Sequence, residues 1–333
     1  MRVLWTHNFD PRINNTGTFM NIMAEGVRNV GIDLELCYLG NLRSVKNLLR
    51  ARRLVKHIAG DFDLIHAQFG SACAVATMGA KNVPRILSLR GSDWYWYKEK
   101  CNYHMMHGLL ATMMSRKAIK SYNLIITMSN RMTREVTRHR PFGGVVTLPS
   151  PVDLESFRPL DKGAARARLG FAGDTTKWVL FTTLSTKNPV KRVPLAIEAV
   201  NRARNGMGGI TLKIATGLSH EEMPLFVGAC DLVLCTSVYE GWPNCIKEAL
   251  ACNIPFVSTD VSDLSLIADQ DPSCRICAPD PDILADNICD VLCTQSTESL
   301  RHHVAQMDVS VVGKKLVELY MATLSKPRTF EYR

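Results

Sequence analysis

The sequence predicts an α/β protein with two Rossmann-like domains in tandem, each built around a mainly parallel sheet. The 333 residues suffice for two domains, since a domain usually contains about 100–200 residues. Short apolar segments alternate with segments of helix length, which is typical of repeated strand–helix units. The alternation breaks once, at a proline-rich stretch, and then begins again, which indicates a second domain.

The predicted strands are short apolar segments that end in polar turns. Six precede the break: "RVLWTH" (2–7), "DLELCYL" (33–39), "FDLIHAQFG" (62–70), "PRILSLRGSD" (84–93), "YNLIITMS" (122–129) and "VVTLPSP" (145–151). Five follow it: "WVLFTTLS" (178–185), "ITLKIATG" (210–217), "DLVLCTS" (231–237), "IPFVSTD" (254–260) and "RICAP" (275–279). Ligands bind at the carboxyl ends of the strands in such sheets, so a site is expected in the loops that follow them.

The break lies in "LPSPVDLESFRP" (148–159), where three prolines stand among polar residues. Proline lacks a backbone N–H and disfavours helix in the residue before it, so neither a helix nor a strand is expected to continue here. The helix predicted next is "VPLAIEAVNRARNG" (193–206), which ends on a glycine.

The composition is that of an ordinary globular protein, with 46% apolar residues. No apolar run approaches the roughly 20 residues of a membrane span, and the N-terminal "MRVLWTHN" lacks the apolar core of a signal peptide, so we expect a cytoplasmic protein. The 11 cysteines are scattered through predicted strands and helices, which indicates free thiols. Only Cys274 and Cys277 lie close together, and no second pair at zinc-site spacing accompanies them.

The formal net charge is +9, and lysine and arginine concentrate before residue 145. This asymmetry indicates that the first half meets nucleic acid or acidic lipid, although a solvated charged face has the same composition. Two basic segments also carry apolar residues at near-helical intervals, and these stripes face either the core or a membrane. The first has Leu42, Val45, Leu49, Val55 and Ile58 among Arg43, Lys46, Arg50, Arg53 and Lys56; the second has Met106, Leu110 and Met113 beside Arg116, Lys117 and Lys120.

The segment "YEGWPNCIKEAL" (239–250) closely follows a predicted strand. Glu240 and Gly241 then lie in a strand-to-helix loop, and a helix begins near Pro243, a residue suited to the first turn. The free amides of that turn suit an anion, whereas the carboxylates of Glu240 and Glu248 suit hydroxyl groups. Two carboxylates around an amide cluster therefore describe a nucleotide sugar. The alternative is that Glu248 faces solvent and Glu240 only caps the helix.

Glu240, Glu248 and the following "ALACNIPFVSTDVSDL" (249–264) resemble the signature of the retaining glycosyltransferases of family 4. The resemblance extends along the chain. "NNTGTFM" (14–20) is similar to the glycine-bearing loop after the first strand, and "VGKKLVELYMATL" (312–324) to the last helix. "RGSD", "EGWPN" and "ACNIP" together resemble a subgroup that builds bacterial cell-surface polysaccharides, including teichuronic-acid-type enzymes.

The resemblance implies the GT-B fold, in which two Rossmann-like domains face a central cleft. It implies an acceptor-binding domain over 1–153 and a nucleotide-sugar-binding domain over 154–312. A C-terminal helix and tail over 313–333 would pack back on the first domain.

The resemblance also implies roles in donor binding. Glu240 would contact the transferred sugar and Glu248 the ribose hydroxyls. Lys191 matches a family lysine that binds the diphosphate. Ser185 occupies the position of a family arginine, so Lys187 or Arg192 would supply the missing positive charge. The alternative is that this segment is a solvated loop. The other positions near the sugar or phosphates would be Gly17 and the amides of Gly241, Trp242 and Asn244.

Arg90 departs from the family, because many relatives have a histidine there, close to the reacting carbon. Arginine cannot act as a base at neutral pH, so Arg90 is expected to orient phosphate or acceptor. Asp93 would bind an acceptor hydroxyl or accept its proton, unless a donor phosphate oxygen takes that proton, as front-face transfer in the family implies. His66 is a further acceptor contact or a buried histidine. Trp94 opens an aromatic run (94–97) that stacks on sugar, lies at a lipid interface or is buried.

We therefore expect a retaining glycosyltransferase that moves a sugar from a UDP- or GDP-linked donor to a glycan or lipid-linked acceptor in cell-surface polysaccharide biosynthesis. The predicted catalytic residues are Glu240, Asp93, Arg90 and Lys191, with no metal or other cofactor. Asp280 and Asp282 form an Asp-x-Asp pair, but in a polar turn that enters a helix.

A lipid-linked acceptor would place the protein at the inner face of the plasma membrane, with peripheral contact to anionic lipid. The alternatives are a GT-B nucleotide-sugar epimerase and a non-catalytic polyanion-binding protein. Nucleic acid is not an expected partner, because no nucleic-acid motif is present.

Overall fold

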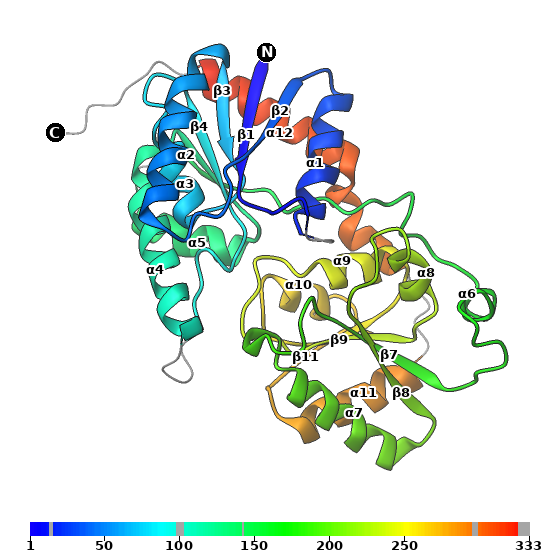
Figure 1. The fold of residues 1–333 in the computed structure, drawn as a ribbon. Coiled ribbons are helices and arrows are strands. Elements are labelled where there is room, and N and C mark those ends of the chain that lie inside the picture. The colour runs from blue at the N-terminus through cyan, green and yellow to red at the C-terminus, as the bar shows by residue number, and fades with distance from the viewer. Residues whose placement is uncertain (13–15, 98–102, 142, 295–298, 326–333) are drawn as a thin grey trace. The chain divides into compact units, whose positions relative to one another are not determined.

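The computed structural model describes residues 1–12, 16–97, 103–141, 143–294 and 299–325. The chain forms two compact units (Figure 1), which we call unit 1, Met1–Ser150 with Val309–Arg333, and unit 2, Pro151–Asp308. The chain thus passes between units at 150/151 and 308/309, near the expected boundaries at 153/154 and 312/313. Part of the loop at 14–20 and the tail at 326–333 lie outside the described residues.

Unit 1 contains a six-stranded parallel sheet with the order β2-β1-β3-β4-β5-β6. Each strand lies within a predicted segment, because strands buried on both faces are nearly continuous apolar runs. The register pairs Val3 of β1 with both Leu34 and Leu64. The strands are β1 (Arg2–His7), β2 (Asp33–Tyr38), β3 (Leu64–Ala67), β4 (Arg85–Leu89), β5 (Leu124–Thr127) and β6 (Val145–Thr147).

The helices of unit 1 cover this sheet. Ser44 begins α2 and Ser129 begins α5, because each hydroxyl accepts a hydrogen bond from an amide of the first turn. The core under α2 and α3 includes Ala51, Val55 and Ile65. The helices are α1 (Thr18–Asn29), α2 (Val45–Ile58), α3 (Ser71–Thr77), α4 (Tyr103–Ala118), α5 (Asn130–His139) and α12 (Val309–Ser325), with short 3₁₀ segments η1 (Ala59–Asp61) and η2 (Ile119–Ser121).

Helix α12 belongs to unit 1 although it is last in the chain (Figure 1). It packs against α1 at two glycines, and a Cβ added to Gly313 would lie 2.6 Å from the carbonyl oxygen of Gly26. Farther along, the Tyr320 hydroxyl accepts a hydrogen bond of 2.8 Å from Trp5 Nε1 and contacts His66 Nδ1 at 2.8 Å. These contacts fix α12 to the sheet of unit 1.

Replacing Gly313 with alanine is expected to lower the free energy of unfolding by about 1–3 kcal/mol, because the new methyl group meets backbone that cannot rotate away. Gly206 is a matched control, since it is also helical and a Cβ there would meet nothing within 4 Å. Gly206→Ala should be neutral or stabilising. Denaturant unfolding of both variants tests this, and equal stabilities would show that α1 and α12 are not closely packed.

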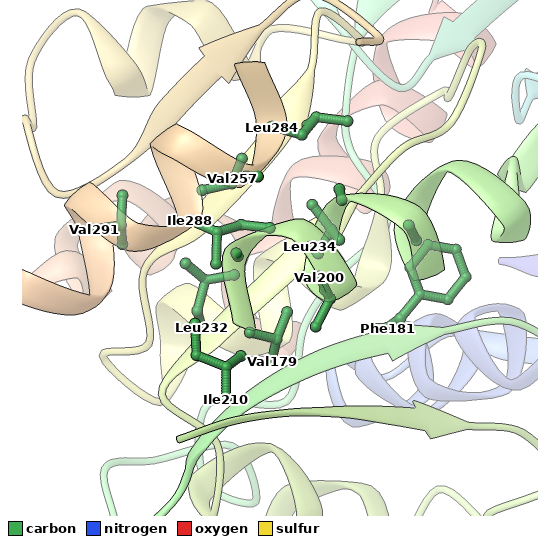
Figure 2. Close-up of a cluster of buried hydrophobic side chains, with 14 of the residues drawn as sticks. Val179, Phe181, Val200, Ile210, Leu232, Leu234, Val257, Leu284, Ile288 and Val291 are labelled. Atoms are coloured by element: carbon green, nitrogen blue, oxygen red, sulfur yellow. The ribbon is translucent and has the colours of Figure 1, made fainter. Parts of the chain in front are cut away.

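Unit 2 contains a five-stranded parallel sheet with the order β11-β10-β9-β7-β8. Figure 2 shows its core, where Val179, Leu232 and Leu234 of the sheet pack against Val200 of α7 and Ile288 of α11. The strands are β7 (Lys177–Thr182), β8 (Ile210–Ala215), β9 (Leu232–Cys235), β10 (Phe256–Thr259) and β11 (Arg275–Cys277). The helices are α6 (Lys162–Arg168), η3 (Pro189–Lys191), α7 (Val193–Met207), α8 (Met223–Gly228), α9 (Asn244–Ala251), α10 (Leu264–Ala268), α11 (Pro281–Cys293) and η4 (Leu300–Met307).

Two parallel sheets flanked by helices confirm the predicted fold class. The helix predicted at 193–206 instead ends at Met207, because Gly208, with φ of 73°, provides the C-cap. In the described part of the chain, every helix falls short of the length and apolar character that a membrane crossing needs.

Candidate functional site

The predicted donor-binding residues of unit 2 lie in segments that follow two neighbouring strands. Lys191 ends η3, which follows β7, and Glu240 lies in the loop between β9 and α9. Since β7 pairs with β9, both loops leave the same edge of the sheet. The carboxyl edge of a parallel sheet is where ligands bind in this class of fold.

Lys191 and Glu240 form a salt bridge, with 2.7 Å between Nζ and Oε1. Ser237 donates a second hydrogen bond, of 2.8 Å, to the same oxygen. Thr236 donates to the backbone carbonyl of Lys191 at 2.7 Å, which ties its segment to the end of β9. The Glu240 Oε2 atom has no hydrogen-bond partner among the described residues. The pair therefore presents a positioned cation and a free carboxylate oxygen.

The pair is mostly buried, since the side chains of Lys191 and Glu240 are 24% and 20% exposed. Burial by itself would lower the pKa of Lys191, but the neighbouring Glu240 carboxylate outweighs it and raises the pKa well above the ordinary value. Lys191 is consequently a permanent cation throughout the physiological pH range.

The loop after Glu240 leads directly into α9. Pro243 is the N-cap of α9, as the sequence predicted, and its carbonyl accepts hydrogen bonds from Ile246 and Lys247. Ser262 holds the carbonyl of Gly241 through a hydrogen bond of 2.8 Å. The amides of Gly241, Trp242 and Asn244 are predicted to lie near the sugar or phosphates. They have no hydrogen-bond acceptor among the described residues. Their role in binding an anion stays a prediction.

Glu248 is a half-buried residue of α9. Desolvation by burial raises the pKa of its carboxyl to about 7, and the nearby charge of Lys247 only partly opposes this. No hydrogen bond or ion pair of this carboxyl to a described residue is present. A partly desolvated carboxylate without donors is costly, so the position favours a ligand that brings hydroxyl groups.

The cations predicted to replace the missing arginine lie in different settings. Lys187 is exposed, in the turn that Thr183 and Ser185 form after β7. Arg192 is the N-cap of α7 with φ of 50°, a conformation that non-glycine residues rarely adopt. Its side chain lines a pocket of about 710 Å³ together with Ser237, Asp260 and Arg275. The role of both cations in diphosphate binding stays a prediction.

In unit 1, Gly17 immediately precedes α1 in the left-handed conformation, with φ of 76°. Its carbonyl accepts hydrogen bonds from Met20 and Asn21, and a Cβ at this position would lie 2.9 Å from the Cβ of Phe9. Only glycine fits this turn without strain. The structure thus explains the glycine by local geometry, and its predicted contact with donor phosphates stays a prediction.

His66, a predicted acceptor contact, lies inside unit 1. This residue of β3 is fully buried, and its ring nitrogens contact Tyr320 and Ser88, each at 2.8 Å. Burial and the positive charge of Arg90 lower the pKa of its imidazole well below the ordinary value. His66 is the neutral, satisfied histidine of the alternative interpretation, and it has no free atom for an acceptor.

Asp93 and Trp94 are also internal, and their predicted contacts with an acceptor stay predictions. The Asp93 carboxylate is fully buried and accepts hydrogen bonds from the amides of Gly70, Arg90 and Gly91. Trp94 is 2% exposed. These three amide bonds hold Asp93 in the loop after β4, while burial raises the pKa of its carboxyl above the ordinary value.

Arg90, which was predicted to orient phosphate or acceptor, lies at the edge of the unit 1 sheet. Its guanidinium donates to Gln68 Oε1 at 2.5 Å and to Ser150 Oγ at 2.9 Å, and it lies 4.7 Å from the ring centroid of Phe19. Burial lowers its pKa to about 10, which leaves it a cation at neutral pH. The neighbouring side chains thus fix its position.

Six buried side-chain polar atoms have no hydrogen-bond partner among the described residues, and sequence reasoning missed four of them that lie at or after the carboxyl ends of strands. Three lie at the ends of strands β1 and β3, and the fourth follows β8 in unit 2, where its ring lies 5.5 Å from that of Phe157. Orphaned buried polar groups are rare in proteins and often indicate an absent ligand or water. The signal in the sequence was a polar residue at or soon after the end of an apolar strand. The atoms are His7 Nδ1, Asn8 Oδ1, Gln68 Nε2 and His220 Nε2.

Asp280 is a helix cap, as predicted. Its side chain accepts hydrogen bonds from the amides of Asp282 and Ile283 at the start of α11. Asp282 forms a salt bridge with Arg202. Both carboxylates of the Asp-x-Asp pair are therefore engaged in stabilising helices.

Comparison with protein families gives two matches that together span most of the chain. The family described as "Glycosyltransferase Family 4" matches residues 3–156, and the one described as "Glycosyl transferases group 1" matches residues 194–294. A curated relative is TuaC of Bacillus subtilis (strain 168), named as a teichuronic acid biosynthesis glycosyltransferase, which is 28% identical over 220 residues. The match covers 61% of this chain, and the chain spans about half the length of this relative, 54%.

Solved structures share the fold over nearly the whole chain. Sucrose-phosphate synthase from Thermosynechococcus elongatus aligns with a TM-score of 0.79 at 15% identity, covering 97% of this chain and 98% of its own. Anabaena HepE in complex with UDP and glucose aligns with a TM-score of 0.72 at 14% identity, covering 97% and 100%. At such identities the likeness concerns the fold.

Proposed function

We propose that the chain is a glycosyltransferase of the family 4 type with the GT-B fold, and that it transfers a sugar from a nucleoside-diphosphate sugar to a hydroxyl group. The proposed acceptor is a glycan or a lipid-linked glycan of cell-surface polysaccharide biosynthesis. The proposed transfer retains the configuration of the anomeric carbon.

The observations that support this proposal are the Lys191–Glu240 pair and the carboxyl of Glu248, which has no partner among the described residues. Breaking the bond between the sugar and the diphosphate builds negative charge on the leaving phosphate. Lys191, held in place by Glu240 and by Thr236, would stabilise that charge without reorganisation, which is how a preorganised site lowers a barrier. The free Oε2 of Glu240 would accept a hydrogen bond from a sugar hydroxyl, and Glu248 would accept those of the ribose.

We propose that no metal ion is required, because Lys191 and the amides that begin α9 provide the positive potential. The Asp93 carboxylate is buried and accepts hydrogen bonds from three amides, so no exposed carboxylate beside it is proposed as a base for the acceptor. Transfer of the acceptor proton to a donor phosphate oxygen is consistent with that arrangement. The proton then leaves with the nucleoside diphosphate, and charge is balanced.

Acceptor binding is proposed for the carboxyl edge of the unit 1 sheet. His7 and Gln68 offer buried nitrogens without partners, and Arg90 offers a fixed cation close to Phe19. Aromatic rings beside polar groups suit sugars, which combine apolar C–H faces with hydroxyl groups. Among relatives, HepE has been solved with UDP-glucose, and TuaC is named for teichuronic acid biosynthesis, which supports a UDP-linked donor and a glycan acceptor.

A thermal-shift panel tests the donor class. Purified protein is heated with UDP, GDP or ADP, first without metal and then with Mg²⁺, and ligand binding to the folded state must raise the apparent Tm. We expect one nucleotide to raise the Tm without metal, and Glu248→Ala to abolish the shift. Glu155→Ala, at an exposed glutamate of unit 2, is the control that should keep it. A shift that requires Mg²⁺, or one unchanged in Glu248→Ala, would overturn the proposed donor site.

A further inference from the structure

Two cysteines of unit 2 lie within electrostatic range of the Lys191–Glu240 pair. Cys235 is the last residue of β9, and Cys245 is the second residue of α9. Helix α9 packs against β9, and the Cys245 thiol donates a hydrogen bond to the sulfur of Cys235. Both thiols are free and buried, with exposed fractions of 3% and 8%. Two thiols in contact, from different elements of the fold, are placed to form a disulfide.

The two thiols differ in acidity from other buried thiols of the protein. The hydrogen bond from Cys245 lowers the pKa of the Cys235 thiol although burial opposes this, and the positive charge of Lys191 acts in the same direction as the hydrogen bond. By contrast, burial raises the pKa of Cys73 and of Cys230 to about 12. The thiolate is the nucleophile in thiol oxidation, so Cys235 is suited to react and the other two are not.

A pocket of unit 2 leads to this pair of cysteines. It has a volume of about 710 Å³, and Ser237 and Val238 line it where β9 ends. The Cys235 Sγ atom lies 3.6 Å from the Ser237 hydroxyl oxygen. A hydroperoxide that enters this pocket is therefore one side chain away from the Cys235 sulfur. We expect the burial of the two thiols to exclude bulky reagents and to admit hydrogen peroxide.

We propose that Cys235 and Cys245 are an oxidation site, which hydrogen peroxide converts to a disulfide that weakens donor binding. The Cys235 thiolate attacks a peroxide oxygen, so that an S–O bond forms, the O–O bond breaks and hydroxide leaves to take a proton from solvent. The Cys245 sulfur then attacks the resulting sulfenic acid. An S–S bond forms, the S–O bond breaks, and the departing hydroxide takes the proton of the thiol. Two thiols are oxidised, and one peroxide is reduced to two waters.

The disulfide acts on the donor site through β9 and α9. Asn244, whose amide is predicted to lie near the sugar or phosphates, directly precedes Cys245. Ser237, which donates a hydrogen bond to Glu240, follows Cys235 closely. A disulfide brings the two sulfurs from contact to bonding distance, so the first turn of α9 and the end of β9 are drawn together. This effect on donor binding rests on the proposed function, whereas formation of the disulfide does not.

Mass spectrometry of the folded full chain tests the disulfide without any ligand. Trypsin leaves Cys235 and Cys245 in one peptide, 214–247, and further cleavage after Glu240 separates them unless they are linked. We expect hydrogen peroxide to give the linked peptides in the wild type and dithiothreitol to release them. Cys245→Ala should give no linked peptides. Cys293→Ala, at an exposed thiol of α11, is the matched control and should link like the wild type. A peroxide-treated wild type without the link would overturn the proposal.

Nucleotide binding tests the effect of the disulfide. The thermal-shift panel of UDP, GDP and ADP is repeated on reduced and on peroxide-treated protein. In oxidised protein that still unfolds cooperatively, we expect binding of the recognised nucleotide to weaken by about tenfold or more, because displaced groups lose their contacts. Dithiothreitol should restore binding, and Cys245→Ala should be insensitive to peroxide.

The two measurements separate this proposal from that of the donor site. A linked wild type that binds nucleotide like the reduced protein would contradict the effect on donor binding. If the reduced protein responds to no nucleotide, the proposed donor site is wrong. The linked peptides then still decide whether Cys235 and Cys245 are an oxidation site.

Discussion

Replacing Glu240 with glutamine is expected to lower the rate of sugar transfer by about 10²–10³-fold, the range for loss of one preorganised electrostatic contact at a reacting centre. The substitution keeps the shape of the side chain but removes the charge that positions Lys191, 2.7 Å away. It also weakens the acceptor for a sugar hydroxyl. The measurement is the initial rate of nucleoside-diphosphate release with the donor that the thermal-shift panel identifies.

Lys191→Met and the double variant of Lys191 and Glu240 help to interpret the Glu240→Gln result. Lys191→Met should cause a loss of similar size, because it removes the cation that faces the leaving phosphate. The double variant should lose less than the sum of the two effects, since residues that act as a pair are not additive. Glu155→Gln is the control at an exposed position of the same unit. Unchanged rates in Glu240→Gln, with the protein folded, would contradict the placement of the site.

Replacing Glu248 with glutamine is expected to weaken donor binding by about 10–100-fold near pH 8, because hydrogen bonds to a charged group are lost. The effect should depend on pH. The Glu248 carboxyl has a pKa of about 7 in the folded protein, and hydroxyl donors of a ligand favour its ionised form. The ratio of the wild-type donor affinity to that of the glutamine variant should therefore rise as pH passes through 7. Well below pH 7, the two affinities should be nearly equal. Calorimetric titration across this range measures the difference.

The raised pKa of Glu248 also makes the stability of the ligand-free protein depend on pH. This dependence is opposite to that of donor affinity, because stability falls as pH rises. Burial raises the pKa from 4.5 to about 7, so between these values the folded state binds a proton that the unfolded state has lost. The contribution of Glu248 to stability is therefore largest at low pH and falls as pH rises through this window. The Tm of the wild type relative to Glu248→Gln should decline over that interval. A difference in Tm that does not change with pH would show that Glu248 is solvated.

The strands could be predicted from the sequence, because buried parallel strands are apolar runs between polar turns. The strand order in each unit could not, since segments such as "DLVLCTS" and "IPFVSTD" carry no mark of which neighbour they pair with. The end of α7 was missed by one residue because two glycines lie close together and only Gly208 adopts the conformation of a C-cap.

The site in unit 2 was more predictable than the site in unit 1. Glu240 and Glu248 lie around a helix N-terminus, so a local pattern places them, and the position of Lys191 agrees with the family resemblance. In unit 1, polar residues that follow strands are equally common in structural roles. Asp93 accepts a hydrogen bond from Gly70 and His66 contacts Tyr320, and sequence reasoning could not foresee these bonds because the partners are distant in sequence. The unpartnered atom of His7 was missed for the same reason.

The central claim is that a sugar leaves its nucleoside diphosphate with retained configuration at the site of Lys191 and Glu240. Nuclear magnetic resonance of the matched nucleotide sugar, incubated with wild type and with Glu240→Gln, tests it most directly, since water can serve as a slow acceptor. We predict that the wild type releases nucleoside diphosphate and a sugar whose first-formed anomer matches the donor, and that the variant does so far more slowly. An epimerised nucleotide sugar with its diphosphate intact would contradict transfer, and a first-formed anomer of inverted configuration would contradict retention.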